Sequence, residues 1–251
     1  MNIRAKIKIL VLAAGQGTRM KSELPKVLTP FQSQPMIKHL LESIDESGID
    51  PRPTIVVGHK KEEVMEAIGT GYDYAVQDKQ LGTGHAVISA QKFLENKAEN
   101  IMVLPSDHPF ISAKTLSNLA EKHLESGGKI TMATVKLPDF DDWRSVFYNS
   151  FSRIIRDESG NIIKDVQYRD ATDEEKKITE VNPIFFCFNA SWLWEKLKTL
   201  DTNNDQKQYY LTDLVKKAIE EGEKITTITI DPHEALAANS KEELEILEKF
   251  A

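Results

Sequence analysis

A glycine-rich stretch near the N-terminus contains the residues best suited to chemistry. It reads Leu12-Ala13-Ala14-Gly15-Gln16-Gly17-Thr18-Arg19-Met20, and Lys26 follows it in Leu24-Pro25-Lys26. Glycines directly after an apolar strand let backbone N–H groups approach phosphate oxygens without interference from side chains. Arg19 and Lys26 supply two cations that can neutralise a triphosphate and the pyrophosphate formed from it. The stretch therefore predicts a phosphate-binding loop suited to transfer at the α-phosphorus.

Two common phosphate-binding motifs do not match this stretch. A P-loop ends in Gly-Lys-Ser/Thr, and a dinucleotide-binding fingerprint has a third glycine at the start of a helix. Neither is present here. The alternative interpretation is a structural glycine loop with solvated basic residues, which two glycines alone would favour. Because the whole string is present, we favour phosphate binding.

Composition and charge limit the class of protein. The 251 residues are 40% hydrophobic and 28% charged, the balance of a globular protein with a packed core. A net charge of −7 repels polyanions, so we expect no nucleic-acid partner. The apolar run over 7–14 is too short to cross a bilayer, and the single cysteine, Cys187, can form no internal disulfide. We expect a cytoplasmic protein without a membrane partner.

Short β-rich runs alternate with amphipathic segments in the first half of the chain. This pattern predicts an α/β fold with a Rossmann-like mixed, mainly parallel sheet flanked by helices. Strands are expected over 7–13, 53–57, 72–76 and 101–104, and helices over 36–46, 61–68, 84–95 and 113–125.

The second half is richer in strands, with little helix at first, and we expect it to form the far wall of a cleft. Asp157-Glu158-Ser159-Gly160-Asn161 predicts a hairpin turn, and Ser240 is the expected N-cap of the last helix. Strands are expected over 130–137, 152–156, 161–168, 178–188 and 224–230, and helices over 191–200, 209–221 and 241–250.

The glycine-rich string and the Pro-Lys after it resemble the signature of the sugar-1-phosphate nucleotidyltransferases. Within this family the chain is most similar to the uridyltransferase half of the bifunctional N-acetylglucosamine-1-phosphate uridyltransferases. The resemblance covers nearly the whole chain, and its further matches are Gln77, 80–86, Asp107, 169–171, 209–213 and Asn239.

The resemblance implies the nucleotide-diphospho-sugar transferase fold, built as one domain over 1–251. Residues 1–128 would form about the nucleotide-binding half, and residues 129–251 the sugar-binding half with the C-terminal helix. The chain ends without the hexapeptide repeats of the bifunctional enzymes, so we expect their acetyltransferase activity to be absent. Nothing in the sequence indicates the oligomeric state.

The resemblance also implies the roles of individual residues, with UTP as the donor. Arg19 and Lys26 are the implied catalytic cations. Gln77 offers both a donor and an acceptor to a pyrimidine, and Gly82 permits close backbone approach, although Gly82-Thr83 also reads as a helix cap. The implied nucleotide-binding residues are Leu12, Ala13, Ala14, Gly15, Gly17, Thr18, Gln77, Gly82 and Thr83.

A metal site is implied at Asp107 and Asn239. Asp107 follows the apolar strand 101–104, at the edge where open α/β sheets place ligands. Mg²⁺, the cofactor that the resemblance implies, usually takes only one or two protein ligands. Without the resemblance, Asp107 and Asn239 would be read as caps of a turn and of the last helix. His85 is read as a neutral residue on a helix face.

The sugar side departs from the family pattern. Gly-Tyr-Gly-Arg is replaced by Ser150-Phe151-Ser152-Arg153, and Glu-x-Lys-Asp-Ala by Gln167-Tyr168-Arg169-Asp170-Ala171. Glu-Ile-Asn-Thr-Gly is replaced by Glu180-Val181-Asn182-Pro183-Ile184, and Tyr-Gly-Asp by Pro105-Ser106-Asp107. The sugar-binding candidates are therefore Ser152, Gln167 and Asn182.

The implied reaction joins UTP to a sugar 1-phosphate, N-acetylglucosamine 1-phosphate or a related sugar, and releases pyrophosphate. The attacking phosphate is already anionic, so no general base is needed. Two alternatives remain open: a nucleotide-sugar binding or regulatory module with weak or no transfer, and a nucleotidyltransferase with another nucleotide donor or another acceptor.

Overall fold

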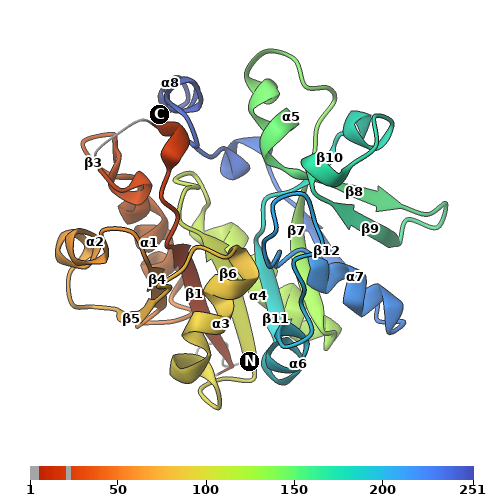
Figure 1. Ribbon diagram of the computed structural model, residues 1–251, viewed down its shortest axis with the longest axis horizontal. Coiled ribbons are helices and arrows are strands. Elements are labelled where there is room, and N and C mark those ends of the chain that lie inside the picture. Colours follow the sequence, from red (N-terminus) through yellow and green to blue (C-terminus); the bar gives the residue numbers. More distant parts are fainter. Residues whose placement is uncertain (1–5, 21–23) are drawn as a thin grey trace.

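The computed structural model describes residues 6–20 and 24–251, apart from the side chain of Thr18. A large sheet runs through the molecule, with helices packed on both of its faces (Figure 1). A separate two-stranded hairpin consists of β2 (Pro30–Phe31) and β3 (Gln34–Pro35). The strands of the large sheet are β1 (Ile7–Ala13), β4 (Thr54–Val57), β5 (Asp73–Val76), β6 (Asn100–Pro105), β7 (Ile130–Lys136), β8 (Ser152–Arg156), β9 (Ile162–Val166), β10 (Glu180–Asn182), β11 (Phe186–Asn189) and β12 (Thr226–Thr229).

The sheet is mixed, and its N-terminal strands pair in parallel. Its order is β5-β4-β1-β6-β11-β7-β10-β8-β9, and β12 pairs in parallel with β7. The pairs β1–β4, β1–β6 and β4–β5 are parallel. From β11 to β9 each strand runs antiparallel to its neighbours in this order. The predicted α/β fold class is therefore confirmed, including the strand-rich second half.

Two hydrophobic cores lie on opposite faces of the sheet. Ile9 and Val11 of β1 belong to one core, whereas Leu10 belongs to the other, because side chains alternate along a strand. Helices α1 (Met36–Ser47) and α4 (Ala113–Ser126) cover the first face. The second face is covered by α3 (Thr83–Leu94), α6 (Ala190–Leu197) and α7 (Asp213–Glu220). The remaining helices are α2 (Lys61–Ile68), α5 (Val146–Ser150) and α8 (Lys241–Glu248).

The single strand expected over 178–188 is wrong. The structure has two strands there, β10 and β11, which pair with different neighbours. Pro183 has no N–H to donate to a ladder, and Ile184 has a φ of 66°, in the left-handed region that a strand cannot use. The apolar, β-branched composition of the segment conceals this break.

The helix expected over 209–221 begins only at Asp213. The backbone of Tyr209 is engaged elsewhere, because its N–H donates to the Leu81 carbonyl at 2.8 Å and its carbonyl accepts from Gly84 at 2.8 Å. Little helix lies between the later strands, as expected: α5 has 5 residues, and the 3-10 turn before it (Asp142–Ser145) has 4. The hairpin at Gly160, with a φ of 83°, and the N-cap at Ser240 are confirmed.

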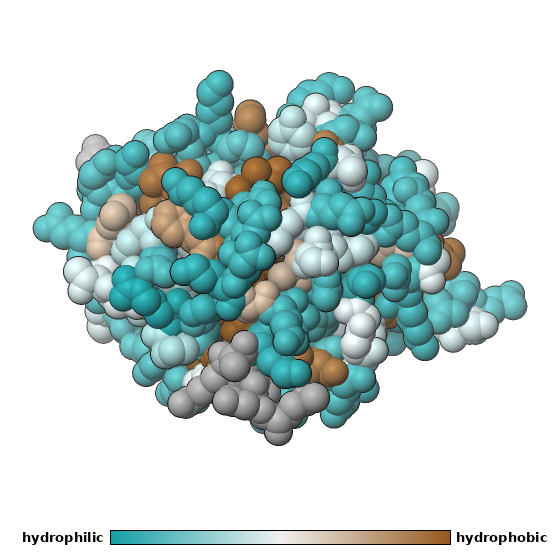
Figure 2. Space-filling model, turned by 90° about the horizontal axis from the view of Figure 1, so that it is seen from below, coloured by the Kyte–Doolittle hydropathy of each residue, from teal (hydrophilic) through white to brown (hydrophobic). Residues whose placement is uncertain are grey.

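The outer surface carries mainly polar side chains. Figure 2 shows one face of the molecule, on which hydrophobic residues gather only in small groups among hydrophilic ones. Among the described residues, no helix combines the length and the apolar composition needed to cross a bilayer.

Candidate active site

A cavity of about 670 Å³ opens at the carboxyl ends of β1 and β6. Its walls come from both halves of the chain, because the glycine-rich loop and the segment after β6 face the turn after β10 and the segment before α8. The predicted site residues that line this cavity are Leu12, Ala14, Gly15, Gly17, Lys26, Gln77, Gly82, Thr83, Asp107, Asn182 and Asn239.

Four predicted site residues do not line the cavity. Ala13 is buried in the core, and Arg19 is exposed on the short turn Thr18–Met20. Ser152 is buried, and Gln167 donates from Nε2 to the Thr212 hydroxyl at 2.9 Å. The side chain of Thr18 lies outside the described residues.

Gly17 brings the glycine-rich loop against Lys26. It has a φ of 63°, and a Cβ built on it would lie 2.5 Å from the Cβ of Lys26. Any other residue would be strained and would push Lys26 away. A Cβ on Gly15, by contrast, would meet no atom within 4 Å among the described residues, so this part of the loop is open toward the cavity.

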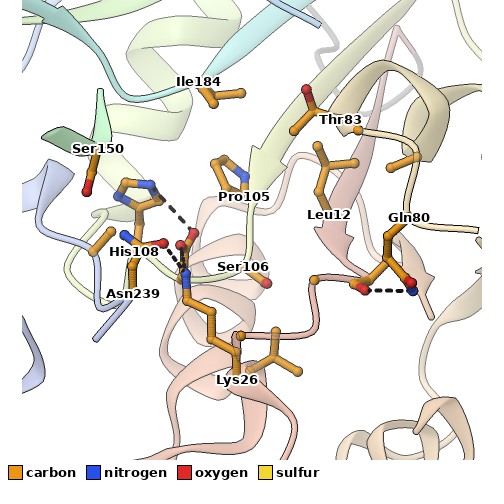
Figure 3. Close-up of a pocket in the computed structure, with 18 of the residues that line it drawn as sticks. Leu12, Lys26, Gln80, Thr83, Pro105, Ser106, His108, Ser150, Ile184 and Asn239 are labelled. Atoms are coloured by element: carbon orange, nitrogen blue, oxygen red, sulfur yellow. Dashed lines mark hydrogen bonds and ion pairs between the residues drawn. The ribbon is translucent and has the colours of Figure 1, made fainter. Parts of the chain in front are cut away.

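Lys26, Asp107 and Asn239 meet at one end of the cavity (Figure 3). The Lys26 ammonium forms an ion pair with Asp107 and donates to Asn239 Oδ1 at 2.6 Å. Only 12% of the Lys26 side chain and 16% of the Asp107 side chain are exposed. Burial alone would raise the pKa of Asp107, but the charge and hydrogen bond of Lys26, together with His108 and a backbone hydrogen bond, outweigh burial and hold this pKa at about 2. The carboxylate is therefore fully ionised at neutral pH.

His108 stands beside this cluster, and the sequence did not single it out. Its Nδ1 lies 3.0 Å from the Ala235 carbonyl and therefore carries a proton, while Nε2 lies 3.7 Å from Asp107 Oδ1. Burial lowers the pKa of His108, so the ring is neutral at neutral pH. The signal that could have identified His108 as a site residue is its position directly after Asp107 in the sequence.

Gln80 connects the glycine-rich loop to the loop before α3. Its Oε1 accepts from Gln16 Nε2 at 3.0 Å, and its Nε2 donates to the Ala14 carbonyl at 3.4 Å. The sequence placed Gln80 among the matching residues without giving it a role.

Gln77 is held with its carbonyl free. Its Nε2 lies 3.0 Å from the Gly82 carbonyl and 3.0 Å from His85 Nδ1, which uses both of its hydrogens. Within the described part of the chain, no donor contacts Gln77 Oε1. Gly82 has a φ of 108°, and a Cβ there would lie 2.6 Å from the Tyr209 carbonyl. This wall can therefore accept a hydrogen bond from a planar base.

Asn182 is the predicted sugar-binding residue that lines the cavity, and the protein orients its amide. Its Nδ2 donates to Asp165 Oδ2 at 2.7 Å, and its Oδ1 accepts from the Ile184 N–H at 2.7 Å. One N–H and one lone pair remain for a ligand.

Asp165, behind Asn182, is a buried carboxyl group. Burial raises its pKa to about 7, and the hydrogen bond from Asn182 offsets only part of this effect. The native state therefore holds a proton that the unfolded chain releases near its ordinary pKa of 3.8. Stability falls as the pH rises from about 4 through about 7.

An Asp165→Asn variant should not lose this part of its stability as the pH rises, because its amide does not titrate. We expect it to match the wild type within about 1 kcal/mol near pH 4 and to exceed its free energy of unfolding by roughly 2–4 kcal/mol near pH 8. Urea denaturation across this pH range measures the difference. Asp213, whose pKa burial also raises, is present in both proteins, and its negative charge adds to the raised pKa of Asp165. Parallel stability curves for the two proteins would contradict the prediction.

Arg153 holds the sugar-side wall together. It is fully buried and donates to the carbonyls of Lys176, Phe151 and Tyr148 at 3.1, 2.7 and 2.6 Å. Its guanidinium also lies over the rings of Phe140, Tyr148 and Tyr168. Burial lowers the pKa of Arg153, but carbonyl and ring contacts keep its charge satisfied.

An Arg153→Met variant should lose about 3 kcal/mol or more of its free energy of unfolding, because the carbonyls keep their burial and lose their donor. The control is Arg169→Met, since Arg169 is 64% exposed and its change should stay within about 0.5 kcal/mol. Urea denaturation of the two variants measures these losses. Equal losses in both variants would show that the buried contacts of Arg153 contribute little to stability.

The sheet, the glycine loop after its first strand and the cation at its carboxyl edge form a site suited to binding phosphates. A Bacillus anthracis protein assigned as a glucose-1-phosphate thymidylyltransferase shares the fold, with a TM-score of 0.78, 18% identity, and coverage of 98% of this chain and 95% of that one. The model of the MobA-like NTP transferase domain matches residues 9–217, and the chain belongs to this family.

Curated relatives agree with this family. The chain is 42% identical to the bifunctional protein GlmU of Carboxydothermus hydrogenoformans, over 96% of this chain and 52% of that protein. It is 38% identical to GlmU of Caldicellulosiruptor saccharolyticus, over 97% of this chain and 51% of that protein. The chain thus spans about half the length of these relatives. The resemblance seen in the sequence is confirmed.

Proposed function

We propose that this chain transfers a uridylyl group from UTP to a sugar 1-phosphate and releases pyrophosphate. The observation that carries this proposal is the meeting of Lys26, Asp107 and Asn239 beside an open glycine loop. A cation and two hard oxygen ligands at this place suit the phosphates of a bound nucleotide.

The oxygens of Asp107 and Asn239 fit Mg²⁺, because the Lys26 ammonium already lies on both of them as a stand-in cation. Mg²⁺ usually keeps several waters and takes few protein ligands. Bound there, Mg²⁺ would supply charge neutralisation to the phosphate oxygens.

The residues of the chain would position two phosphates against their mutual repulsion. The loop N–H groups would bind the triphosphate, and Lys26 would turn from Asp107 to the α-phosphate as negative charge builds on it. Arg19, exposed on the turn after the loop, would reach the pyrophosphate that leaves. The acceptor phosphate attacks as an anion, so no residue needs to remove a proton.

Gln77 supports uracil as the base. Its free Oε1 accepts hydrogen bonds, and the N3 position of uracil carries a hydrogen to donate, whereas N3 of cytosine is itself an acceptor. With CTP, Gln77 Oε1 and N3 of cytosine would face each other as two acceptors without a hydrogen between them. The backbone around Gly82 would lie against the face of the base.

The acceptor would be N-acetylglucosamine 1-phosphate or a related sugar 1-phosphate, contacted by Asn182. We further propose that the chain forms a single catalytic domain, because residues of both 1–128 and 129–251 line the same cavity. We also propose that it works in the cytoplasm. The Asn182 amide already contacts Asp165 and the Ile184 N–H, which leaves fewer of its groups for an acceptor sugar. This observation favours a second candidate function, a module that binds nucleotide sugars with weak or no transfer.

Pyrophosphate release separates the two candidates. The protein is incubated with Mg²⁺, each of four nucleoside triphosphates and a panel of sugar 1-phosphates that includes N-acetylglucosamine 1-phosphate. UTP-dependent release with one sugar supports the transferase. Silence across the panel, with a UDP-sugar still bound, would favour the binding module.

A further inference from the structure

The turn between β10 and β11 contains a residue in an unfavourable backbone conformation. Ile184 has a φ of 66°, where the Cβ of a β-branched residue crowds the backbone. Glycine or asparagine would adopt this conformation more readily. A residue that stays there must be held by its surroundings.

Both sides of the turn hold Ile184 in place. Asn182 Oδ1 accepts from the Ile184 N–H at 2.7 Å, and Pro183 restricts the backbone between them. On the other side, Phe185 is fully buried, its carbonyl accepts from Ala133 at 2.9 Å, and its ring lies 4.8 Å from that of His108. The conformation of Ile184 is therefore fixed before any ligand arrives.

This conformation places the Ile184 side chain at the cavity wall. In Figure 3 Ile184 lies beyond Pro105, on the side of the cavity away from Lys26. The side chain is half-buried and packs against the core under α6 and α7, which prevents it from moving aside. Pro183, its neighbour in the turn, also lines the cavity, so this part of the wall is apolar.

We propose that Ile184 determines which acceptor sugar is accepted, by limiting the size of the ring substituent that reaches this turn. The inference rests on the proposed function. In Figure 3 Ile184 lies across the cavity from Lys26, beside which the phosphates would lie. The polar side chain of this turn that lines the cavity is the Asn182 amide, which already donates to Asp165 Oδ2 and accepts from the Ile184 N–H.

Binding of UDP and a panel of UDP-sugars, measured by calorimetry, tests the inference without requiring turnover. The panel pairs UDP-glucose with UDP-sugars that carry larger or smaller groups at each ring carbon. We expect the wild type to bind the best UDP-sugar about tenfold or more tightly than the poorest one, which is the scale at which a pocket discriminates between ligands that differ by one chemical group. Ile184→Ala and Ile184→Gly should both reduce this ratio of affinities to about threefold and leave the affinity for UDP unchanged. Ile163→Ala is the control, since Ile163 is 50% exposed on β9 and does not line the cavity.

The two variants separate bulk from backbone strain, because alanine keeps the positive φ penalty and glycine removes it. An unchanged ratio in both variants, or a change in the glycine variant alone, overturns the inference while the proposed function stands. A wild type that binds neither UDP nor any UDP-sugar overturns the proposed function and the inference with it.

Discussion

A Lys26→Met variant is expected to release pyrophosphate about 10²–10³-fold more slowly than the wild type, which is the usual cost of removing one preorganised charge from a transition state. Methionine keeps the length of the side chain and removes the ammonium that lies on Asp107 and Asn239. The loss should appear mainly in kcat, because charge on the α-phosphate develops as the reaction proceeds. Initial rates at saturating UTP and sugar 1-phosphate measure it.

Lys114→Met is the matched control, since Lys114 is exposed on α4 away from the cavity. This variant should keep the wild-type rate. Circular dichroism and urea midpoints should show both variants folded. A Lys26→Met enzyme with near-normal kcat would remove Lys26 from the mechanism.

The second large effect is expected for Asp107→Asn. The amide still accepts a hydrogen bond from Lys26 but no longer carries the charge that attracts Mg²⁺, so activity should fall by about 100-fold or more. Binding of Mn²⁺, followed by electron paramagnetic resonance in the presence of UTP, should weaken by about tenfold or more in the same variant. The two readouts connect the lost activity to the lost ion.

Asp173→Asn serves as the control for this change, because the Asp173 side chain is 94% exposed, pairs with Lys176 and does not line the cavity. It should leave both the activity and Mn²⁺ binding unchanged. If Asp107→Asn lost activity but bound Mn²⁺ as the wild type does, the carboxylate would act on Lys26 and not on a metal ion.

The strands of the N-terminal half could be predicted because local signals agree there. The apolar run of β1 stops where the glycines begin, and its observed limits, Ile7–Ala13, are the predicted ones. The break at Pro183 and Ile184 was missed because the apolar, aromatic run after it favours a strand, although Pro183 was a local signal against one continuous strand. The structure separates β10 from β11 by their pairing with different neighbours. The late start of α7 likewise depends on a distant partner, the backbone of Leu81 and Gly84.

The site shows the same division between local and distant information. The open loop and the close packing of Gly17 on Lys26 follow from glycines at fixed spacing. The meeting of Lys26 with Asp107 and Asn239 joins residues 81 and 213 positions apart, which spacing cannot predict. The resemblance implied Asp107 and Asn239 as a pair, without the contact to Lys26. Asp165 gave no sequence signal, because an acidic residue in a strand reads as solvent-facing until its neighbours are known.

The position of a radioactive label in the products shows whether the α-phosphorus of UTP is transferred to a sugar phosphate. The protein is incubated with Mg²⁺, an accepted sugar 1-phosphate and UTP labelled either at the α- or at the γ-phosphorus. We predict that the α-label appears in a UDP-sugar and the γ-label in pyrophosphate, in equal amounts. A γ-label released as orthophosphate, or an α-label that stays in UTP with every sugar tested, would contradict the proposed function.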